Sequence, residues 1–217
     1  MNDVRHPHGS ETPGDAAAFW EQRYAEAGPV WSGRVNAVVA EIAASLPAGT
    51  ALDLGCGEGG DAVWLAVHGW TVTAVDISPT AVARGEAAAR QRSLDRIRFV
   101  AADLAVFDPG ARFSLVTASF LHSPTMLDRV AVLRRAAGFV EPGGRLLITS
   151  HAAPPPWATQ LHEHRAELLP PDEDLARLNL DPTLWETVVC EVRRRDATAP
   201  DGSAATLDDG VILLRRR

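Results

Sequence analysis

The pattern of hydrophobic and polar positions divides the chain into a helical start, an alternating middle and a different end. Two segments with apolar residues at helical spacing come first, at residues 16–27 and 30–46. Five apolar runs of strand length follow, separated by helical segments; these runs are 51–54, 71–77, 97–104, 113–120 and 145–151. Strands that alternate with helices predict a parallel sheet with helices on both faces.

The segments between these strands carry helix and turn signals. The helical segments are 61–69, 78–93 and 124–140. Ser78 followed by Pro79 is typical of a helix N-terminus, and we expect Asp15 to cap the first helix. The Pro142-Gly143-Gly144 sequence predicts a turn before the fifth strand.

The last third of the chain has a different pattern. Residues 151–185 are polar, proline-rich and weakly periodic, which indicates an insertion over one end of the sheet. Residues 185–196 and 205–217 then alternate with period two around Pro200-Asp201-Gly202, which predicts a hairpin. The expected fold is therefore an α/β, doubly wound, Rossmann-like sheet of seven strands, mostly parallel, with an antiparallel C-terminal hairpin.

The expected domain organisation is simple. Residues 1–14 are polar and contain Pro and Gly, so we expect them to be disordered. Residues 15–217 are expected to form a single domain, in which 15–47 form an N-terminal helical cap or lid. A chain of 217 residues with 46% hydrophobic content is long enough for one sizeable core.

Composition narrows the function. The formal net charge of -7 disfavours a nucleic acid or an anionic membrane as partner. The sequence contains no Lys, which excludes lysine Schiff-base chemistry and a P-loop. Two cysteines, Cys56 and Cys190, make no disulfide framework, and no apolar run approaches the roughly 20 residues that span a bilayer. We expect a cytoplasmic protein, either a monomer or a homodimer.

A glycine loop follows the first strand of the alternating region. Gly55, Gly57 and Gly60 form the G-x-G-x-x-G pattern of dinucleotide-binding loops, between a strand and a helix. Glycine lets the backbone turn tightly and approach a ligand closely. However, Asp53 and Glu58 would repel a pyrophosphate at this position. The loop therefore favours a ligand without phosphate and with positive charge.

Two later carboxylates end strands at the same edge of the predicted sheet. Asp76 follows Gly57 by about 20 residues, the spacing at which a carboxylate binds ribose hydroxyls. The alternative for Asp76 is a turn or capping role. Asp103 ends the third strand and could accept a hydrogen bond from an adenine amino group, or could be a turn residue. An adenosine would suit Asp76 and Asp103, and a positively charged tail would suit Asp53 and Glu58. S-adenosylmethionine has both.

At this point the sequence resembles a known family. The segments DLGCGEGG (53–60), TAVDIS (73–78), AADL (101–104) and FSLVTASFLH (113–122) match, in order and spacing, the motifs of class I S-adenosylmethionine-dependent methyltransferases. The sequences FWEQRY and VWSGR and the compact length are similar, more weakly, to small bacterial methyltransferases of the tellurite-resistance and thiopurine type.

The resemblance implies a set of cofactor-binding residues. Those at the methionine end are Asp53, Gly55, Cys56 and Gly57, those at the ribose and adenine are Asp76, Ile77, Asp103 and Leu104, and Ser119 ends the fourth strand. Trp31 would stack on the ligand from the lid, with core packing as the alternative. Cys56 is interpreted as a small loop residue and not as a nucleophile.

The methyl acceptor is expected beyond the fourth and fifth strands. His122 could deprotonate or orient an acceptor, or could cap the following helix or bind the backbone. His151, Trp157, His162 and His164 could wall an acceptor pocket. A metal site is the sharper alternative, but His162 and His164 lie two residues apart and face different sides of a helix, so solvated loop histidines are favoured and no metal is expected.

These features together predict a methyltransferase that uses S-adenosylmethionine, yields S-adenosylhomocysteine and acts on a small molecule by in-line transfer. The acceptor atom, O, N, S or C, is left open. Two alternatives remain at this point: a non-catalytic S-adenosylmethionine-binding protein, and a nicotinamide-dependent oxidoreductase, since G-x-G-x-x-G is present.

Overall fold

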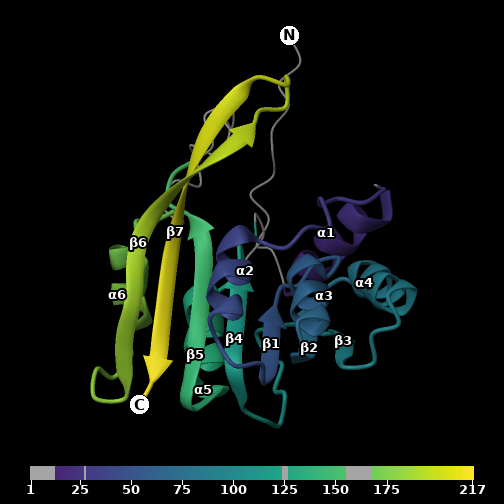
Figure 1. The fold of residues 1–217 in the computed structure, drawn as a ribbon. Helices are drawn as coiled ribbons and strands as arrows, with labels where there is room; N and C mark the ends of the chain where they lie inside the picture. Colours follow the sequence, from purple (N-terminus) through teal and green to yellow (C-terminus); the bar gives the residue numbers. More distant parts are fainter. Residues whose placement is uncertain (1–12, 27, 124–126, 155–167) are drawn as a thin grey trace.

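The protein is described by a computed structural model, which defines residues 13–26, 28–123, 127–154 and 168–217. In this part of the chain one seven-stranded sheet runs in the order β3-β2-β1-β4-β5-β7-β6 (Figure 1). The strands are β1 (Thr50–Leu54), β2 (Thr71–Asp76), β3 (Ile97–Ala101), β4 (Phe113–Ser119), β5 (Val140–His151), β6 (Trp185–Thr198) and β7 (Ala204–Arg216).

The pairing confirms the predicted doubly wound sheet. Strands β1 to β5 pair in parallel, and β7 pairs antiparallel with both β5 and β6. The chain leaves β1 toward β2 and β3 and later returns to β4 on the other side of β1. The carboxyl edge between β1 and β4 is therefore the switch point at which sheets of this kind bind ligands.

Helices cover both faces of the sheet. They are α1 (Pro13–Glu26), α2 (Ala37–Ala44), α3 (Gly60–Val67), α4 (Pro79–Gln91), α5 (Arg129–Gly138) and α6 (Pro171–Leu178). Buried residues of α2, α3 and α4 share one core with one face of the sheet, and those of α5 and α6 share a second core with the other face. No helix of the described residues is long and apolar enough to cross a membrane.

The helix signals were confirmed at some positions and misplaced at others. Ser78 caps α4 through its side chain, with Pro79 in the first turn, as predicted. Helix α1 begins at Pro13, so Asp15 lies inside the helix and does not cap it. Helix α2 begins at Ala37 and not near residue 30, because the Asn36 side chain accepts hydrogen bonds from the first backbone N–H groups.

Two predictions in the second half of the chain need correction. The expected Pro142-Gly143-Gly144 turn lies inside β5, which begins at Val140 and continues past the glycines with a shift of register. The segment expected as an irregular insertion over residues 151–185 contains α6, which packs beside α5 and against β6 and β7. Residues 155–167, with Trp157, His162 and His164, lie outside the described part.

Two elements rise beyond the carboxyl edge, at opposite ends of the sheet (Figure 1). Helix α1 rises on the side of β2 and β3, and the β6–β7 hairpin rises on the side of β5. The β5–β7 ladder ends at the pair His151 and Asp209, whereas β6 and β7 stay paired up to Thr198 and Ala204. Residues of the upper hairpin therefore stand next to the carboxyl end of β5.

Candidate functional site

The glycine loop makes a tight turn from β1 into α3. Gly55 and Gly57 have φ angles of +69° and +52°, in the left-handed region that favours glycine. The Gly55 and Cys56 N–H groups both donate to the Val75 carbonyl, at 2.8 and 3.0 Å. A Cβ on Gly55 would lie 2.7 Å from Leu121 Cδ1. The loop therefore depends on glycine for both its backbone shape and its close packing.

Asp76 ties the glycine loop to the end of β2. The buried carboxylate accepts from the Gly57 N–H at 2.8 Å and from the Ser78 N–H at 2.9 Å. Burial raises the pKa of Asp76, and these N–H groups oppose the shift. Each carboxylate oxygen can accept more than one hydrogen bond. Asp76 thus orders the loop and keeps capacity for a ligand hydroxyl.

Asp53 is a buried carboxylate with one unused oxygen. Thr117 Oγ1 donates to Asp53 Oδ1 at 2.9 Å, while Asp53 Oδ2 is buried without a hydrogen-bond partner among the described residues. Burial raises the pKa of Asp53, Asp61 adds to the shift, and the Thr117 hydrogen bond opposes it. An unsatisfied buried oxygen at the carboxyl edge marks a place where a cationic or donor group would be stabilised.

We expect Asp53→Asn to stabilise the ligand-free fold at high pH. The pKa of Asp53 is higher in the folded than in the unfolded chain, so stability falls as pH rises above about 3.9, the ordinary Asp value. The amide removes this charge, and we expect a gain of about 1–3 kcal/mol at pH 8. Thermal unfolding of both proteins at pH 4 and pH 8 measures it. A gain at pH 4 equal to that at pH 8 contradicts the role of the charge.

A polar cluster joins α2 to the same edge, and the sequence did not single it out. The Asn36 N–H donates to Asp61 Oδ1 at 2.6 Å, and Asn36 Nδ2 lies 3.5 Å from Thr149 Oγ1. Burial raises the pKa of Asp61, and hydrogen bonds from the Asn36 N–H and from the Ser119 side chain, at the end of β4, oppose the shift. Asp61 had no role in the sequence-based interpretation.

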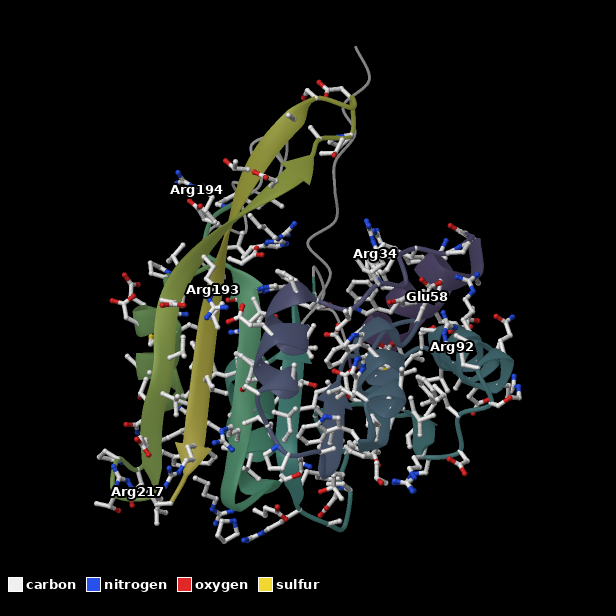
Figure 2. All side chains as sticks on the ribbon, viewed as in Figure 1. Arg34, Glu58, Arg92, Arg193, Arg194 and Arg217 are labelled. Atoms are coloured by element: carbon white, nitrogen blue, oxygen red, sulfur yellow. The ribbon has the colours of Figure 1, made fainter. Side chains whose placement is uncertain are left out.

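Glu58 anchors the lid and does not face the loop's ligand side. Its carboxylate accepts from the Val30 and Trp31 N–H groups, each at 3.0 Å, and from Arg84 Nη1 at 2.8 Å. Arg84 also donates to the carbonyls of Tyr24 and Gly28. Figure 2 shows Glu58 and Arg34 on the side of α1. Glu58 is therefore a structural carboxylate. The sequence analysis expected a positively charged ligand near Glu58, but the positive charge beside it is that of Arg84.

Trp31 and Tyr24 cover the glycine loop. Trp31 Nε1 donates to the Tyr24 hydroxyl at 2.8 Å. A Cβ on Gly57 would lie 3.0 Å from that hydroxyl and 3.3 Å from the Trp31 ring. Tyr24 is buried, and burial raises its pKa, whereas Trp31 is 52% exposed. Trp31 therefore lies beside the loop with an exposed surface, and Tyr24, which the sequence did not single out, lies beside the loop with it.

Helix α1 is fixed to the same edge by side-chain hydrogen bonds. Glu21 accepts from the Ser78 hydroxyl at 2.6 Å and from Thr80 Oγ1 at 2.5 Å, at the start of α4. Trp20 Nε1 donates to Ser123 Oγ at 3.1 Å, in the loop after β4. The lid thus contacts the carboxyl side of both β2 and β4.

The remaining expected cofactor residues lie along this edge. Ile77 follows Asp76, and Asp103 and Leu104 follow β3. Asp103 Oδ1 accepts from the Ala105 N–H at 2.8 Å, which is the turn role weighed for it, and Leu104 is buried. Burial raises the pKa of the Cys56 thiol, as do Asp53 and Asp76, so the thiol stays protonated and is a poor nucleophile.

His122 lies in the loop after β4, on the α5 and α6 side. It lines a cavity of about 170 Å³ with Arg129 and Asp174, and its Nε2 is buried without a hydrogen-bond partner among the described residues. Burial lowers the pKa of His122 to about 4, and the charges of Arg129 and His151 add to the effect. The imidazole is therefore neutral at pH 7 and a weak base. No group of three metal-ligating side chains lies together in the described chain.

Residues 51–144 match a family model described as a methyltransferase domain. A relative from Mycobacteroides abscessus, 2-heptyl-1-hydroxyquinolin-4(1H)-one methyltransferase, is 30% identical over 112 residues, which cover 50% of this chain and 49% of the relative. The chain thus matches about half the length of this relative.

Solved structures share the fold at low sequence identity. The N-methyltransferase NodS from Bradyrhizobium japonicum, in complex with S-adenosylhomocysteine, has a TM-score of 0.66 at 18% identity, over 93% of this chain and 99% of that one. TehB from Haemophilus influenzae has a TM-score of 0.62 at 16% identity, over 84% of this chain and 63% of that one.

Proposed function

Since the chain carries a methyltransferase domain of the class I, S-adenosylmethionine-dependent kind, we propose that it methylates a small molecule at the carboxyl edge of β1 and β4. S-adenosylmethionine is the cofactor of this family. The proposal concerns the residues that hold the cofactor and the nature of the acceptor.

One observation carries the cofactor assignment: Asp53 Oδ2, at the carboxyl end of β1, is buried without a hydrogen-bond partner among the described residues. Gly55 and Gly57 keep the loop beside it in a left-handed turn, with Leu121, Tyr24 and Trp31 packed against the two glycines. A carboxylate oxygen suits an ammonium group. The residues present therefore fit the cofactor.

Each expected residue then receives a proposed role. Asp53, Gly55, Cys56, Gly57 and Ser119 take the methionine end, Asp76 and Ile77 the ribose, and Asp103 and Leu104 the adenine. Trp31 covers the methionine end from the lid. Arg34, whose backbone lies against Gly60, is proposed to pair with the cofactor carboxylate.

The chemistry that the bound cofactor supplies is a methyl group on a sulfonium, which is a good leaving group. The protein has to align the acceptor with that methyl group at about 3–3.5 Å and to exclude water. The lid residues Tyr24 and Trp31 exclude water above Gly57, and Glu58 and Arg84 hold the lid in place.

A small molecule is proposed as acceptor because the formal net charge is -7 and offers little attraction to a polyanion. His122 is proposed to lie on the acceptor side. It precedes Ser123, which accepts a hydrogen bond from Trp20 of α1. RNA is the competing acceptor, because one matched relative is named a ribosomal RNA methyltransferase. Methylation of total RNA but of no small molecule would exclude the proposed acceptor class.

Calorimetric titration with S-adenosylhomocysteine tests the cofactor assignment, with NADH as comparison. We expect micromolar binding of the first and none of the second, since Asp53 lies at the loop. Asp76→Ala should weaken S-adenosylhomocysteine binding at least tenfold, or about 1.4 kcal/mol, because the loop and the ribose both lose an acceptor. An unchanged dissociation constant contradicts the role of Asp76, and NADH binding favours the oxidoreductase alternative.

Turnover separates an enzyme from a binding protein. Formation of S-adenosylhomocysteine with a panel of phenols, thiols and amines is the expected result. Binding without turnover across this panel would favour the non-catalytic alternative.

A further inference from the structure

A histidine–aspartate pair that the proposed cofactor site does not use lies where the carboxyl end of β5 meets the middle of β7. His151, the last residue of β5, lies opposite Asp209 of β7. His151 Nδ1 is 3.2 Å from Asp209 Oδ1. Arg195 of β6 donates from Nε to Asp209 Oδ2. Three neighbouring strands thus contribute a continuous row of a cation, a carboxylate and an imidazole.

The pairing determines which imidazole nitrogen is free. Asp209 is 4% exposed and paired with Arg195, so it is a carboxylate that accepts hydrogen bonds and does not donate them. The His151 Nδ1 therefore carries the proton, and Nε2 keeps its lone pair. The same arrangement orients the histidine in other enzymes that use a His–Asp pair as a base.

The position of His151 along β5 places it in line with the cofactor site. Leu147 packs in the core that contains α2, and Asn36 Nδ2 lies 3.5 Å from Thr149 Oγ1. Since strand side chains alternate, Leu147, Thr149 and His151 share the α2 face. Asp53 lies on this face of β1, as shown by its Thr117 hydrogen bond and the Asp61 charge nearby. His151 ends this polar row on the side away from the adenine residues.

A strained residue holds the imidazole from the β4 side. Phe120 directly follows Ser119 and has a φ angle of +50°, which is rare and strained for a bulky residue. Its ring centre is 4.6 Å from that of His151, and the Arg195 guanidinium lies 5.8 Å above the ring. The loop after β4 therefore turns Phe120 toward the same pair of residues.

Among the described residues, His122 is the other histidine near His151, and the centres of the two rings are 6.3 Å apart. Its lowered pKa of about 4 makes it a weak base, and it has no carboxylate hydrogen bond among the described residues. The charged or titratable groups that face His151 from the described elements are Asp209, Arg195 and His122.

We propose that His151 Nε2 is the general base for the acceptor, that Asp209 and Arg195 position it, and that the acceptor is a weakly acidic hydroxyl such as a phenol. This inference rests on the proposed methyltransferase function. A base is needed only for an acceptor that is protonated at the working pH, so the pair favours a hydroxyl over a thiol, which ionises more readily.

The proposed step balances as a proton transfer coupled to methyl transfer. His151 Nε2 takes the hydroxyl proton while the acceptor oxygen forms its bond to the methyl carbon. The carbon–sulfur bond breaks, and its electron pair stays on sulfur. The products are a methyl ether, S-adenosylhomocysteine and an imidazolium paired with Asp209. Because the His151 side chain is 25% exposed, water can take the proton from it.

Two phenols of different acidity test the base with the full-length protein. At pH 8, p-cresol is protonated and p-nitrophenol is ionised. We expect His151→Gln to lower kcat for p-cresol about 100-fold or more, the usual contribution of a general base, and to change kcat for p-nitrophenol less than about threefold. His68→Gln, an exposed histidine at the end of α3, is the matched control. Equal losses with both phenols, or turnover of neither by the wild type, would overturn the proposal.

The imidazole tautomer gives a readout that is independent of turnover. In ¹⁵N-labelled protein, we expect His151 to carry its proton on Nδ1. In the Asp209→Asn variant, the amide oxygen of residue 209 can still accept the hydrogen bond from Arg195. The amide N–H₂ group then donates to His151 Nδ1, so the imidazole proton should move to Nε2. An Nε2–H tautomer in the wild type overturns the proposal. If the wild type does not bind S-adenosylhomocysteine, the proposed function is contradicted instead. The tautomer would still show whether Asp209 accepts a hydrogen bond from His151 Nδ1.

Discussion

Asp174→Ala is expected to lower the free energy of unfolding by about 3–5 kcal/mol, the usual effect of removing one partner of a buried ion pair. Arg129 at the start of α5 donates to both oxygens of Asp174 in α6, at 2.6 and 2.9 Å. The two side chains are only 14% and 4% exposed, and Arg129 Nε has no hydrogen-bond partner among the described residues. Alanine would leave a buried guanidinium without its counter-charge.

Urea unfolding followed by circular dichroism measures this effect, and the chain offers a matched control. Arg194 and Asp208 form the same two-pronged contact, at 2.9 and 3.3 Å, but on the exposed side of the hairpin. Asp208→Ala should therefore change the midpoint far less. The double variant Arg129→Met/Asp174→Leu should recover much of the loss, since it removes both charges. A loss below about 1 kcal/mol for Asp174→Ala would mean that water solvates Arg129.

Helix α6 shows why part of the fold was beyond sequence reasoning. Its eight residues begin with one proline and three acidic residues, and an isolated helix of this length is marginal in water. Arginines of α5 hold it: Arg129 pairs with Asp174, and Arg134 donates to the carbonyls of Arg177 and Leu178 at the other end. These partners lie more than 40 positions apart in the sequence, so local periodicity carries no signal for them.

The strands and the glycine loop were predictable because their causes are local. Buried strands are continuous apolar runs, Ser78 and Pro79 mark a helix start, and glycines at Gly55 and Gly57 mark a left-handed turn. The same local reasoning failed at Pro142-Gly143-Gly144, where β5 pairs with β4 both before this sequence, at Val140, and after it, at Arg145.

The candidate site was predictable as a set of positions, but its contacts were not. The ends of β1, β2 and β4 follow from the strand pattern, so Asp53, Asp76 and Ser119 could be placed at one edge. Glu58 was interpreted from its charge, but its partner Arg84 lies on α4, 26 positions further along the chain. His151 and Asp209 meet only through the register of β5 and β7, which requires knowing how the hairpin returns to the sheet.

Gly57→Val is expected to weaken S-adenosylhomocysteine binding about 100-fold or more, equivalent to about 2.7 kcal/mol. At a φ angle of +52° a β-branched residue is strained. The new Cβ would lie 3.0 Å from the hydroxyl of buried Tyr24, and the two methyl groups beyond it need space that Tyr24 and Trp31 occupy. Relief of this clash requires the loop to move, which breaks the 2.8 Å hydrogen bond from the Gly57 N–H to Asp76. Calorimetric titration of the folded variant measures the change.

Gly110→Val separates this effect from backbone strain alone. Gly110 has a similar φ angle of +64°, lies between β3 and β4, and a Cβ there would meet no atom within 4 Å. Both variants should lose comparable stability from the strained backbone, about 1–2 kcal/mol, but only Gly57→Val should lose affinity. A wild-type affinity in both variants would show that the ligand does not depend on the loop at Gly57. Equal and large losses would mean that strain anywhere in the fold weakens binding. Selective loss at Gly57 would tie the cofactor to the space beneath Tyr24 and Trp31.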